Sequence, residues 1–217
     1  MNDNYEVRAV KRRDFEWLLL NHHYAKRVPS ISFANGLFDG ADLIGVITFG
    51  APASRHMQVG ASPGNPGAVI ELNRLCVLDS APRNTETWFI ARALKMLPPF
   101  IVVSYADTVH GHLGFVYRAA NFNYAGWTDM ERKTPRYDYI VPGKHTRQAF
   151  RDGRTQFTEK VRRRPKVKYW TVTGDRRQQR DLEREMRWPK ISWADYPPPS
   201  EHQKIANDNL RRDGGAA

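Results

Sequence analysis

The side chains best suited to chemistry follow a short apolar segment in the middle of the chain. Phe100–Ser104 is a continuous apolar run, typical of a strand that is covered on both faces. Ser104, Tyr105 and Asp107 lie at its C-terminal end, which is the edge where open α/β sheets bind ligands. Asp107 is therefore a candidate general base. The alternative is a structural carboxylate that caps the next helix or pairs with an arginine.

Arg74 is a second candidate because it lies within an apolar strand. The alternation in Val69–Val77 places Arg74 and Cys76 on one face. A charge at such a position is costly unless it is paired. If this strand lies beside Phe100–Ser104, Asp107 is a plausible partner for Arg74. Cys76 is expected to be a buried, inert thiol.

Histidines occur as two close pairs. His22 and His23 precede Tyr24 after an expected helix, where they form either a polar cluster or a cover over a site. His110 and His112 have a spacing that can share a metal ion. Because no cysteine or carboxylate cluster accompanies them, residues at a helix start are the favoured interpretation, and no metal site is predicted.

The elements that position these residues alternate between strand and helix patterns. Their order predicts an α/β fold with a mixed, partly parallel central sheet flanked by helices. Gly60–Gly67 is expected to be a loop, and Tyr117 lies on a short helix from which its hydroxyl can return toward the site. The expected strands are Tyr5–Val10, Ser32–Leu37, Leu43–Gly50, Val69–Val77, Phe100–Ser104, Phe122–Trp127 and Tyr137–Val141, and the expected helices are Arg13–Asn21, Thr85–Leu97 and His112–Ala120.

The whole chain of 217 residues has a net charge of +11. Most of this positive excess lies in the last third of the chain. Residues 1–142 contain 15 basic and 13 acidic residues, whereas residues 143–217 contain 19 and 10. Such an excess favours a polyanion, above all nucleic acid. Basic residues run into two aromatic residues there, a pattern that suits phosphate contacts and base stacking. The predicted nucleic-acid contacts are Arg162, Arg163, Arg164, Lys166, Lys168, Tyr169 and Trp170; the alternative is a solvated charged face whose aromatics pack on the main domain.

These patterns predict three regions. Residues 1–142 are the expected catalytic domain, residues 143–199 a basic nucleic-acid-binding extension packed on it, and residues 200–217 a disordered tail. Within the extension, Asp175–Arg187 has the pattern of a helix with mixed charges. No run approaches the roughly 18 apolar residues that a membrane span needs. With a single cysteine and no apolar signal core, the sequence predicts a soluble cytoplasmic protein without a disulfide framework.

The succession of strand, loop, helix, strand and helix that begins with Val69–Val77 and ends near Phe122 resembles part of the GNAT acyltransferase fold. Its helix ending in Tyr117-Arg118-Ala119-Ala120-Asn121-Phe122 is similar to a GNAT helix whose tyrosine is often the general acid. GNAT proteins usually have a glycine-rich pyrophosphate loop, whereas Ala81–Thr87 contains no glycine. A helix N-terminus can still bind a phosphate. On this resemblance the candidate cofactor-binding residues are Arg83, Asn84, Thr85 and Ser104.

A narrower resemblance, over about residues 15–199, is to phage Mom-type DNA adenine modification proteins. It rests on the order and spacing of several short motifs, among them His23-Tyr24, Glu71-Leu72-Asn73-Arg74-Leu75, Ser104-Tyr105-Ala106-Asp107 and the Tyr117 helix. The family converts adenine in phage DNA to N6-carbamoylmethyladenine, which protects the genome from restriction in the host cytoplasm. The resemblance implies that His23, Tyr24, Arg74, Asp107 and Tyr117 are functional.

The resemblance leaves the donor open. An acetyl-CoA-like thioester has no nitrogen for the carboxamide, whereas the glycyl ester of glycyl-tRNA has the right atoms. Double-stranded DNA is the expected partner, with tRNA as a second polyanion and no membrane. His23, His110 and His112 are the residues that could bind an iron ion, although no ligand set is evident. Two other functions compete: a non-catalytic nucleic-acid-binding protein on this fold, and an ordinary small-molecule N-acetyltransferase.

Overall fold

A computed structural model describes residues 4–128, 133–140, 159–196, 198 and 201. The chain forms two compact units. Unit 1 consists of residues 1–106, 114–126 and 168–196, and unit 2 consists of residues 107–113, 127–167 and 197–217. This division differs from the boundary expected after residue 142, because residues 168–196 belong to the same unit as the N-terminal strands.

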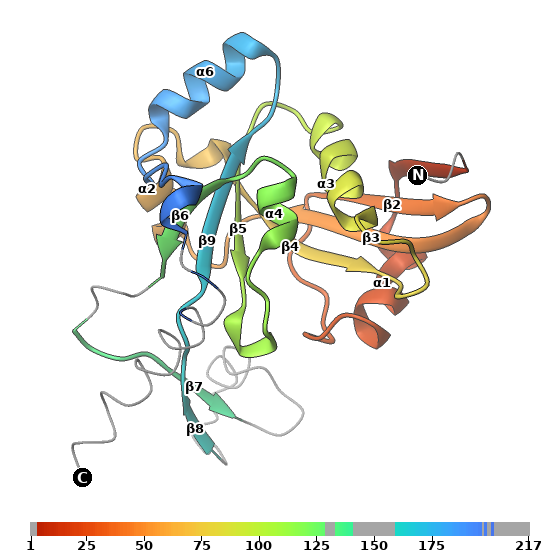
Figure 1. Cartoon of the computed structure of the whole chain (residues 1–217), viewed down its shortest axis with the longest axis horizontal. Coiled ribbons are helices and arrows are strands. Elements are labelled where there is room, and N and C mark those ends of the chain that lie inside the picture. Colours follow the sequence, from red (N-terminus) through yellow and green to blue (C-terminus); the bar gives the residue numbers. More distant parts are fainter. Residues whose placement is uncertain (1–3, 129–132, 141–158, 197, 199–200, 202–217) are drawn as a thin grey trace. The chain divides into compact units, whose positions relative to one another are not determined.

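Unit 1 is built on a mixed seven-stranded sheet (Figure 1). The strand order is β1-β2-β3-β4-β5-β9-β6; β1 to β4 pair in antiparallel fashion, and β4 and β5 are parallel. The predicted α/β fold with a partly parallel sheet is therefore confirmed. The strands are β1 (Tyr5–Ala9), β2 (Phe33–Asp39), β3 (Asp42–Gly50), β4 (Val69–Val77), β5 (Ile101–Ala106), β6 (Asn123–Trp127) and β9 (Val167–Val172).

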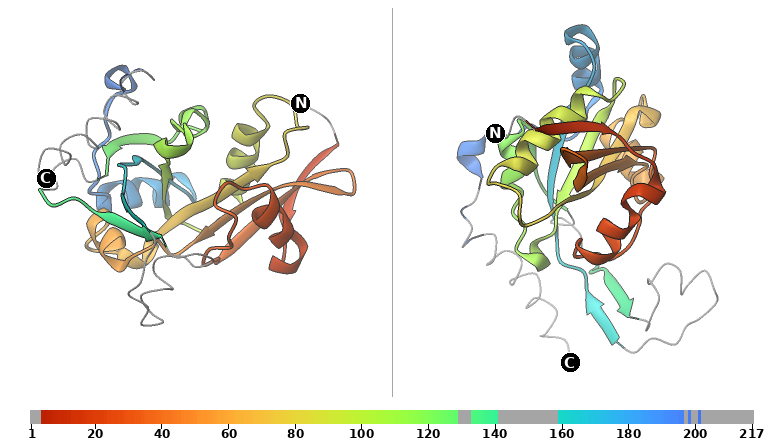
Figure 2. Two further views of the ribbon diagram at one scale, coloured as in Figure 1. Left: turned by 90° about the horizontal axis from the view of Figure 1, so that it is seen from below. Right: turned by 90° about the vertical axis from the view of Figure 1, so that its right-hand side faces the viewer.

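Helices cover both faces of this sheet, with α1 and α3 on opposite sides (Figures 1 and 2). Apolar residues of α1 pack against Val46 of β3 and Cys76 of β4. Another cluster joins α2 and α6 to β4, β5 and β9, with Val69, Ile101 and Trp170 at its centre. The helices are α1 (Arg12–Asn21), α2 (Arg55–Ala61), α3 (Thr85–Lys95), α4 (Phe115–Ala119) and α6 (Arg176–Glu185).

The parallel pairing of β4 and β5 is short. It runs only from Val69 opposite Ile101 to Glu71 opposite Val103, although both strands continue beyond it. On its other edge β4 shifts register against β3, so that Thr48 lies opposite Arg74 but Phe49 lies opposite Leu72. Such a bulge changes the face to which the following side chains point. The polar residues of β4 lie where regular pairing on both sides is interrupted.

Unit 2 contains a two-stranded antiparallel sheet of β7 (Tyr137–Ile140) and β8 (Glu159–Arg162). The Nζ of Lys160 lies 4.1 Å from the centroid of the Tyr137 ring. The sequence predicted Tyr137–Val141 as the last strand of the core sheet, and this was wrong. β9, from the basic segment, takes a place between β5 and β6 instead. Its residues Val167, Tyr169 and Trp170 are buried, which explains why it lies in the sheet.

Two further expectations need correction. Gly60–Gly67 is not entirely a loop, since α2 extends to Ala61 and a 3₁₀ turn covers Pro66–Ala68. The helix expected over His112–Ala120 begins only at Phe115, because Gly114 adopts a left-handed φ of 80° that a continuing helix excludes. The expected disordered tail, apart from residue 201, and residues 143–158 of the expected basic extension lie outside the described residues.

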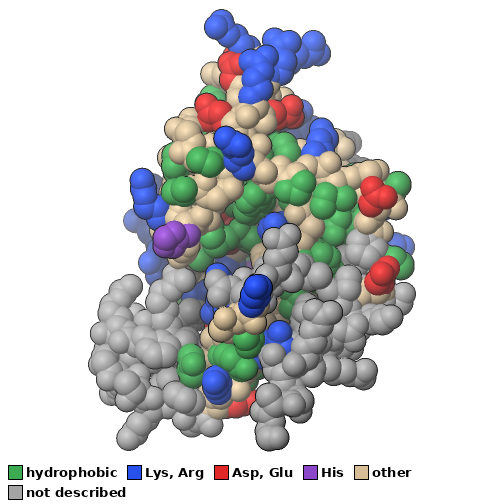
Figure 3. All heavy atoms as spheres, turned by 90° about the vertical axis from the view of Figure 1, so that its left-hand side faces the viewer, with side chains coloured by type: hydrophobic (Ala, Val, Ile, Leu, Met, Phe, Trp, Pro, Cys, Tyr) green, Lys and Arg blue, Asp and Glu red, His purple; other side chains and the backbone are tan. Residues whose placement is uncertain are grey.

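Charged side chains gather over α6, at the top of the face in Figure 3. Arginines and acidic residues alternate along this helix, and Arg184 pairs with Asp181 at 3.0 Å. Asp175 caps it by accepting from the backbone N–H groups of Arg177 and Gln178. The predicted mixed-charge helix is therefore confirmed. None of the helices in the described part of the chain is long and apolar enough to cross a bilayer.

Candidate active site

The segment after α1 is fixed to the sheet of unit 1 by polar residues of β4. Asn73 donates to the carbonyl oxygen of Ser30 at 2.9 Å and accepts from the Thr48 hydroxyl at 2.6 Å. A Cβ at Gly50 would lie 2.1 Å from that same Ser30 oxygen, so only glycine permits this approach. Asn73, which the sequence analysis did not select, thus holds the His23–Ser30 segment over β4.

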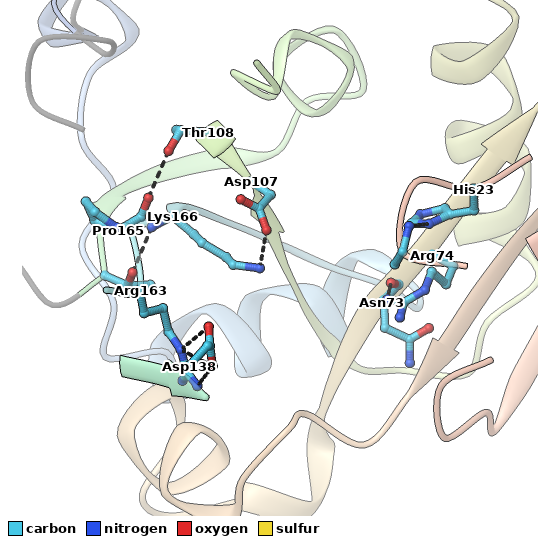
Figure 4. A network of polar contacts seen from close by, with 11 residues as sticks. His23, Asn73, Arg74, Asp107, Thr108, Asp138, Arg163, Pro165 and Lys166 are labelled. Carbon is cyan, nitrogen blue, oxygen red and sulfur yellow. Dashed lines mark hydrogen bonds and ion pairs between the residues drawn. The ribbon is translucent and has the colours of Figure 1, made fainter. Parts of the chain in front are cut away.

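Arg74 lies beneath this segment and is only 9% exposed. Its guanidinium donates to the carbonyl oxygens of Asn73 and, at 3.4 Å, of Arg27 (Figure 4). Nη2 is buried without a hydrogen-bond partner. Burial lowers the pKa of Arg74, and the positive charge of Arg27 lowers it further. The predicted pair between Arg74 and Asp107 stays a prediction.

His23 and Tyr24 form an aromatic pair next to Arg74. His23 is buried, and its Nδ1 accepts from the backbone N–H of Ala25 at 3.0 Å (Figure 4). The Tyr24 ring is 4.3 Å from that of His23, yet its side chain is 42% exposed. An electrostatic interaction with Tyr24 raises the pKa of Arg74 and so opposes part of the lowering. The structure therefore brings together three of the predicted catalytic residues.

Tyr117 projects from α4 and packs between two aromatic rings. Its ring centroid lies 5.1 Å from that of Tyr169 and 5.3 Å from that of Phe122. Burial raises the pKa of Tyr117 to about 12, although the Ser104 hydroxyl opposes this shift. At neutral pH the phenol is therefore protonated, as a proton donor must be.

Glu71 links these groups electrostatically. Its negative charge raises the pKa of Tyr117 and of Tyr105, and it opposes the lowering of the pKa of Arg74. Glu71 is thus a carboxylate near both Arg74 and Tyr117, and it lies where β4 stops pairing with β5. The sequence offered a signal for it, since a carboxylate alternating with apolar residues in a buried strand is unusual.

The four candidate cofactor residues lie in two places of unit 1. Arg83 and Asn84 are exposed ahead of α3, and Asn84 has a left-handed φ of 70°. Thr85 is buried and donates to the carbonyl oxygen of Pro82 at 2.6 Å. Ser104 is fully buried and donates to the carbonyl oxygen of Leu72 at 3.1 Å. Cofactor binding by these residues stays a prediction.

In unit 2, Asp107 is held by an ion pair. Its Oδ2 lies 2.6 Å from Nζ of Lys166, and Thr108 donates to the Pro165 carbonyl oxygen at 3.1 Å (Figure 4). These contacts fix the segment after β5 against the segment before β9. Lys166, predicted as a nucleic-acid contact, therefore already binds the candidate base, a pairing that no sequence pattern indicated.

The other basic residues of the predicted interface have different surroundings. Arg163 forms a two-pronged ion pair with the Asp138 carboxylate. Arg162 and Arg164 flank it in and after β8. In unit 1, Nζ of Lys168 lies 5.2 Å from the centroid of the Trp188 ring. Phosphate binding by these residues stays a prediction.

Tyr169 and Trp170 require a correction. Their side chains are 0% and 4% exposed, so neither ring offers a face on which a base could stack. The Trp170 indole donates to the Pro189 carbonyl oxygen at 3.1 Å, and the Tyr169 and Tyr196 hydroxyls lie 3.1 Å apart. These aromatics pack in the core of unit 1, as the alternative interpretation holds.

The histidines that the structure describes form no evident metal centre. His110 and His112 lie close together in unit 2, with ring centroids 6.1 Å apart, and burial lowers the pKa of His112. Across the described ranges, no group of three or more histidine, cysteine or carboxylate side chains is placed to hold a metal ion. A role for iron is therefore neither supported nor tested by these residues.

Comparison with solved structures returns acyltransferases. A GNAT acetyltransferase from Bacillus cereus aligns with a TM-score of 0.43 at 10% identity, and one from Elizabethkingia anophelis with acetyl-CoA bound aligns at 0.42 and 9%. A Bacillus subtilis acetyltransferase in complex with CoA aligns at 0.40 and 12%. Each alignment covers 79% of this chain and 99% of the other.

The chain belongs to the Mom protein family, whose pattern matches residues 4–186. A curated relative is the methylcarbamoylase Mom of Escherichia phage Mu, which is 36% identical over 117 residues. The alignment covers 50% of this chain and 48% of the phage protein. The chain thus matches about half the length of that relative.

Proposed function

We propose that this protein modifies adenine in DNA to N6-carbamoylmethyladenine and thereby protects the DNA from restriction. Membership of the Mom family and the methylcarbamoylase of phage Mu support this proposal. The observation that carries it is that Glu71, at the end of the β4–β5 pairing, acts electrostatically on both Arg74 and Tyr117. This group combines a cation, a protonated phenol and a carboxylate, which together suit acyl transfer to a weak nucleophile.

The donor in this proposal is a glycyl ester, as carried by glycyl-tRNA. Adenine N6 attacks the glycyl carbonyl carbon and loses its proton to a base, for which Glu71 is the candidate in unit 1. Arg74 stabilises the negative charge that develops on the carbonyl oxygen. The C–O ester bond then breaks, and Tyr117 gives a proton to the departing ribose oxygen, which leaves as a hydroxyl. This step leaves N6-glycyladenine.

A rearrangement completes the product without an oxidant or reductant. The free amine of the glycyl group attacks ring carbon C6, and the bond between C6 and the original N6 breaks. The glycine nitrogen is then attached to the ring, and the original N6 becomes the carboxamide nitrogen. The two compounds are isomers, so every atom is accounted for.

The target base pairs through N6 in a duplex, so the enzyme needs it outside the stack. Extrusion of a base costs a few kcal/mol, which contacts to the DNA backbone must offset. The positive excess of residues 143–217 suits this task. The predicted phosphate contacts are Arg162, Arg163, Arg164 and Lys168.

Isotope labelling tests the donor and the rearrangement together. Purified protein is incubated with DNA and tRNA charged with ¹⁵N-glycine, and the nucleosides are analysed by mass spectrometry. The expected product retains ¹⁵N on the purine after its carboxamide nitrogen is released by hydrolysis. Modification without any charged tRNA would exclude this donor, and label lost with the carboxamide would exclude the rearrangement.

A further inference from the structure

Arg74 is a buried cation whose hydrogen-bond partners are all backbone carbonyl oxygens. Within unit 1, as far as the structure describes it, no acidic side chain forms an ion pair with Arg74. Its contacts are carbonyl oxygens, and Nη2 has none. A buried charge that forms no ion pair is unfavourable, and the negative charge of Glu71 offsets this only in part, since the pKa of Arg74 is still lowered. An anion from outside the chain would remove this cost.

A second cation lies beside the first. Arg27, an exposed residue, provides the backbone oxygen that Arg74 contacts, and its charge acts on Arg74 strongly enough to lower the pKa of that group. Two guanidinium groups near each other repel, and an anion bound to both turns this repulsion into attraction. Guanidinium groups bind phosphate oxygens in pairs, with good geometry.

An aromatic ring from the same turn lies next to these cations. Tyr24 is three residues before Arg27, its ring packs on the buried His23, and 42% of its side chain is exposed. Bases stack on exposed aromatic rings whatever their sequence. The combination of an exposed ring with two guanidinium groups is therefore complementary to a nucleotide.

We propose that Arg74, Arg27 and Tyr24 form a nucleotide-binding site, in which a phosphate group bridges the two guanidinium groups and the base stacks on Tyr24. A phosphate suits this site better than a carboxylate because it has more oxygens and more charge to share between two cations. This inference depends on the proposed function in one respect only, namely that the bound phosphate belongs to a polynucleotide. Binding itself needs no catalysis.

The phosphate reaches Nη2 by displacing part of the turn. The bond from Arg74 Nε to the Arg27 oxygen is long, at 3.4 Å, and so it is weak. Lys26, between Tyr24 and Arg27, has a φ of +40°, which is unfavourable for a residue with a side chain. When phosphate binds, Arg74 loses a weak hydrogen bond to a carbonyl oxygen and gains a charge-assisted one to the phosphate. This exchange favours the bound state.

Calorimetric titration of the full-length protein tests the site. At low ionic strength we expect dAMP to bind at least about tenfold more tightly than deoxyadenosine, the effect of one charge-assisted contact. Arg74→Gln should remove this difference, and Arg27→Gln should reduce it. Tyr24→Ala should weaken dAMP and deoxyadenosine alike while it leaves inorganic phosphate unaffected.

The matched control is Arg92→Gln, which removes an exposed arginine of α3 that stacks on Trp88. Its dAMP affinity should equal that of the wild type, which excludes a general effect of net charge. Equal binding of dAMP and deoxyadenosine by the wild type would overturn the proposal, as would acetate binding as tightly as phosphate. If Arg74→Gln does not fold, the exposed Arg27→Gln decides alone, and unchanged dAMP binding by it would refute the site.

Two polynucleotides could supply the phosphate, and competition distinguishes them. Tighter binding of dAMP than AMP, with displacement by single-stranded DNA, assigns the site to the modified strand. Tighter binding of AMP, with displacement by uncharged tRNA, assigns it to the donor. Either result supports the nucleotide site. A site that binds dAMP in a protein that modifies no DNA would refute the proposed function and leave this inference intact.

Discussion

The two units of this protein hold their charged side chains in different ways. In unit 2, Asp107 pairs with Lys166 and Asp138 with Arg163, and three of these four side chains are about 40% exposed. In unit 1, Arg74 is buried with carbonyl oxygens as its only described partners. Exposed pairs contribute little stability, whereas an unpaired buried charge costs stability. The difference is consistent with the proposal that Arg74 binds a ligand.

The largest expected effect is on catalysis in unit 1. Tyr117→Phe removes the proposed proton donor and leaves the ring packing on Tyr169 intact. We expect activity to fall by about 10²- to 10⁴-fold, the usual contribution of a general acid. The measurement is the initial rate of adenine modification by purified protein, with thermal unfolding to confirm the fold. Activity within a few-fold of wild type would remove Tyr117 from the mechanism.

A second prediction concerns the aromatic residues of β9. Trp170→Ala should destabilise unit 1 by about 3–5 kcal/mol, since it leaves a cavity in a packed core. Arg164→Ala, six positions earlier, should change stability by less than about 0.5 kcal/mol. It should instead reduce the salt dependence of DNA binding by about one phosphate contact. Urea unfolding and DNA titrations at several salt concentrations measure both, and a stable Trp170→Ala would contradict the core assignment.

A third prediction compares an arginine of each unit directly. Arg74→Met should abolish modification while the free energy of unfolding stays the same or rises by about 1 kcal/mol, because a buried unpaired charge is replaced by an apolar chain. Arg163→Met should lower that free energy by about 0–1 kcal/mol, since it breaks an exposed pair. A large loss of stability in Arg74→Met would show that its carbonyl contacts, not a ligand, explain the arginine.

The fourth prediction concerns alkaline pH. Burial raises the pKa of Tyr117 to about 12 from an ordinary value near 10, and it also raises the pKa of Tyr105 and Tyr169. In this interval the unfolded chain loses protons that the folded protein keeps, so the stability present below pH 10 should fall between about pH 10 and 12. Tyr117→Phe should reduce this fall, which unfolding curves at several pH values measure. An unchanged fall in the variant would mean that the surroundings of Tyr117 do not raise its pKa.

The smallest effect is expected at Cys76. Burial raises the pKa of this thiol to about 11, so at neutral pH almost no thiolate is present. A thiol reagent should react with the folded protein far more slowly than with the unfolded chain. Rapid labelling at neutral pH without loss of structure would contradict the packing of α1 on β4.

The sequence predicted helices and strands well where the spacing of the hydrophobic residues and the length of the segment indicated the same element. The hairpin of β2 and β3, the alternation in β4, and α3 and α6 follow from side-chain spacing. The place of β9 could not be predicted, because Lys166 and Lys168 alternate with residues that are buried, and charge hid the strand pattern. Strand order within a sheet depends on long-range packing, which a local pattern does not record.

The candidate site was predicted in part for a related reason. His23, Tyr24 and Arg74 stood out by residue type and resemblance, and the structure places them together. The roles of Asn73 and Lys166 depend on partners more than 40 and 50 residues away, respectively, in the chain. Tyr169 and Trp170 looked suited to stacking because composition cannot distinguish an exposed ring from a buried one.

Mass spectrometry of nucleosides from plasmid DNA tests the central claim most directly. The plasmid is recovered from cells that express either the wild-type protein or Tyr117→Phe. We predict an adenosine derivative heavier by one carbamoylmethyl group with the wild type and only a trace of it with the variant. Unmodified adenosine in DNA from cells with abundant, folded wild-type protein would contradict the account and favour a protein that binds nucleic acid without modifying it.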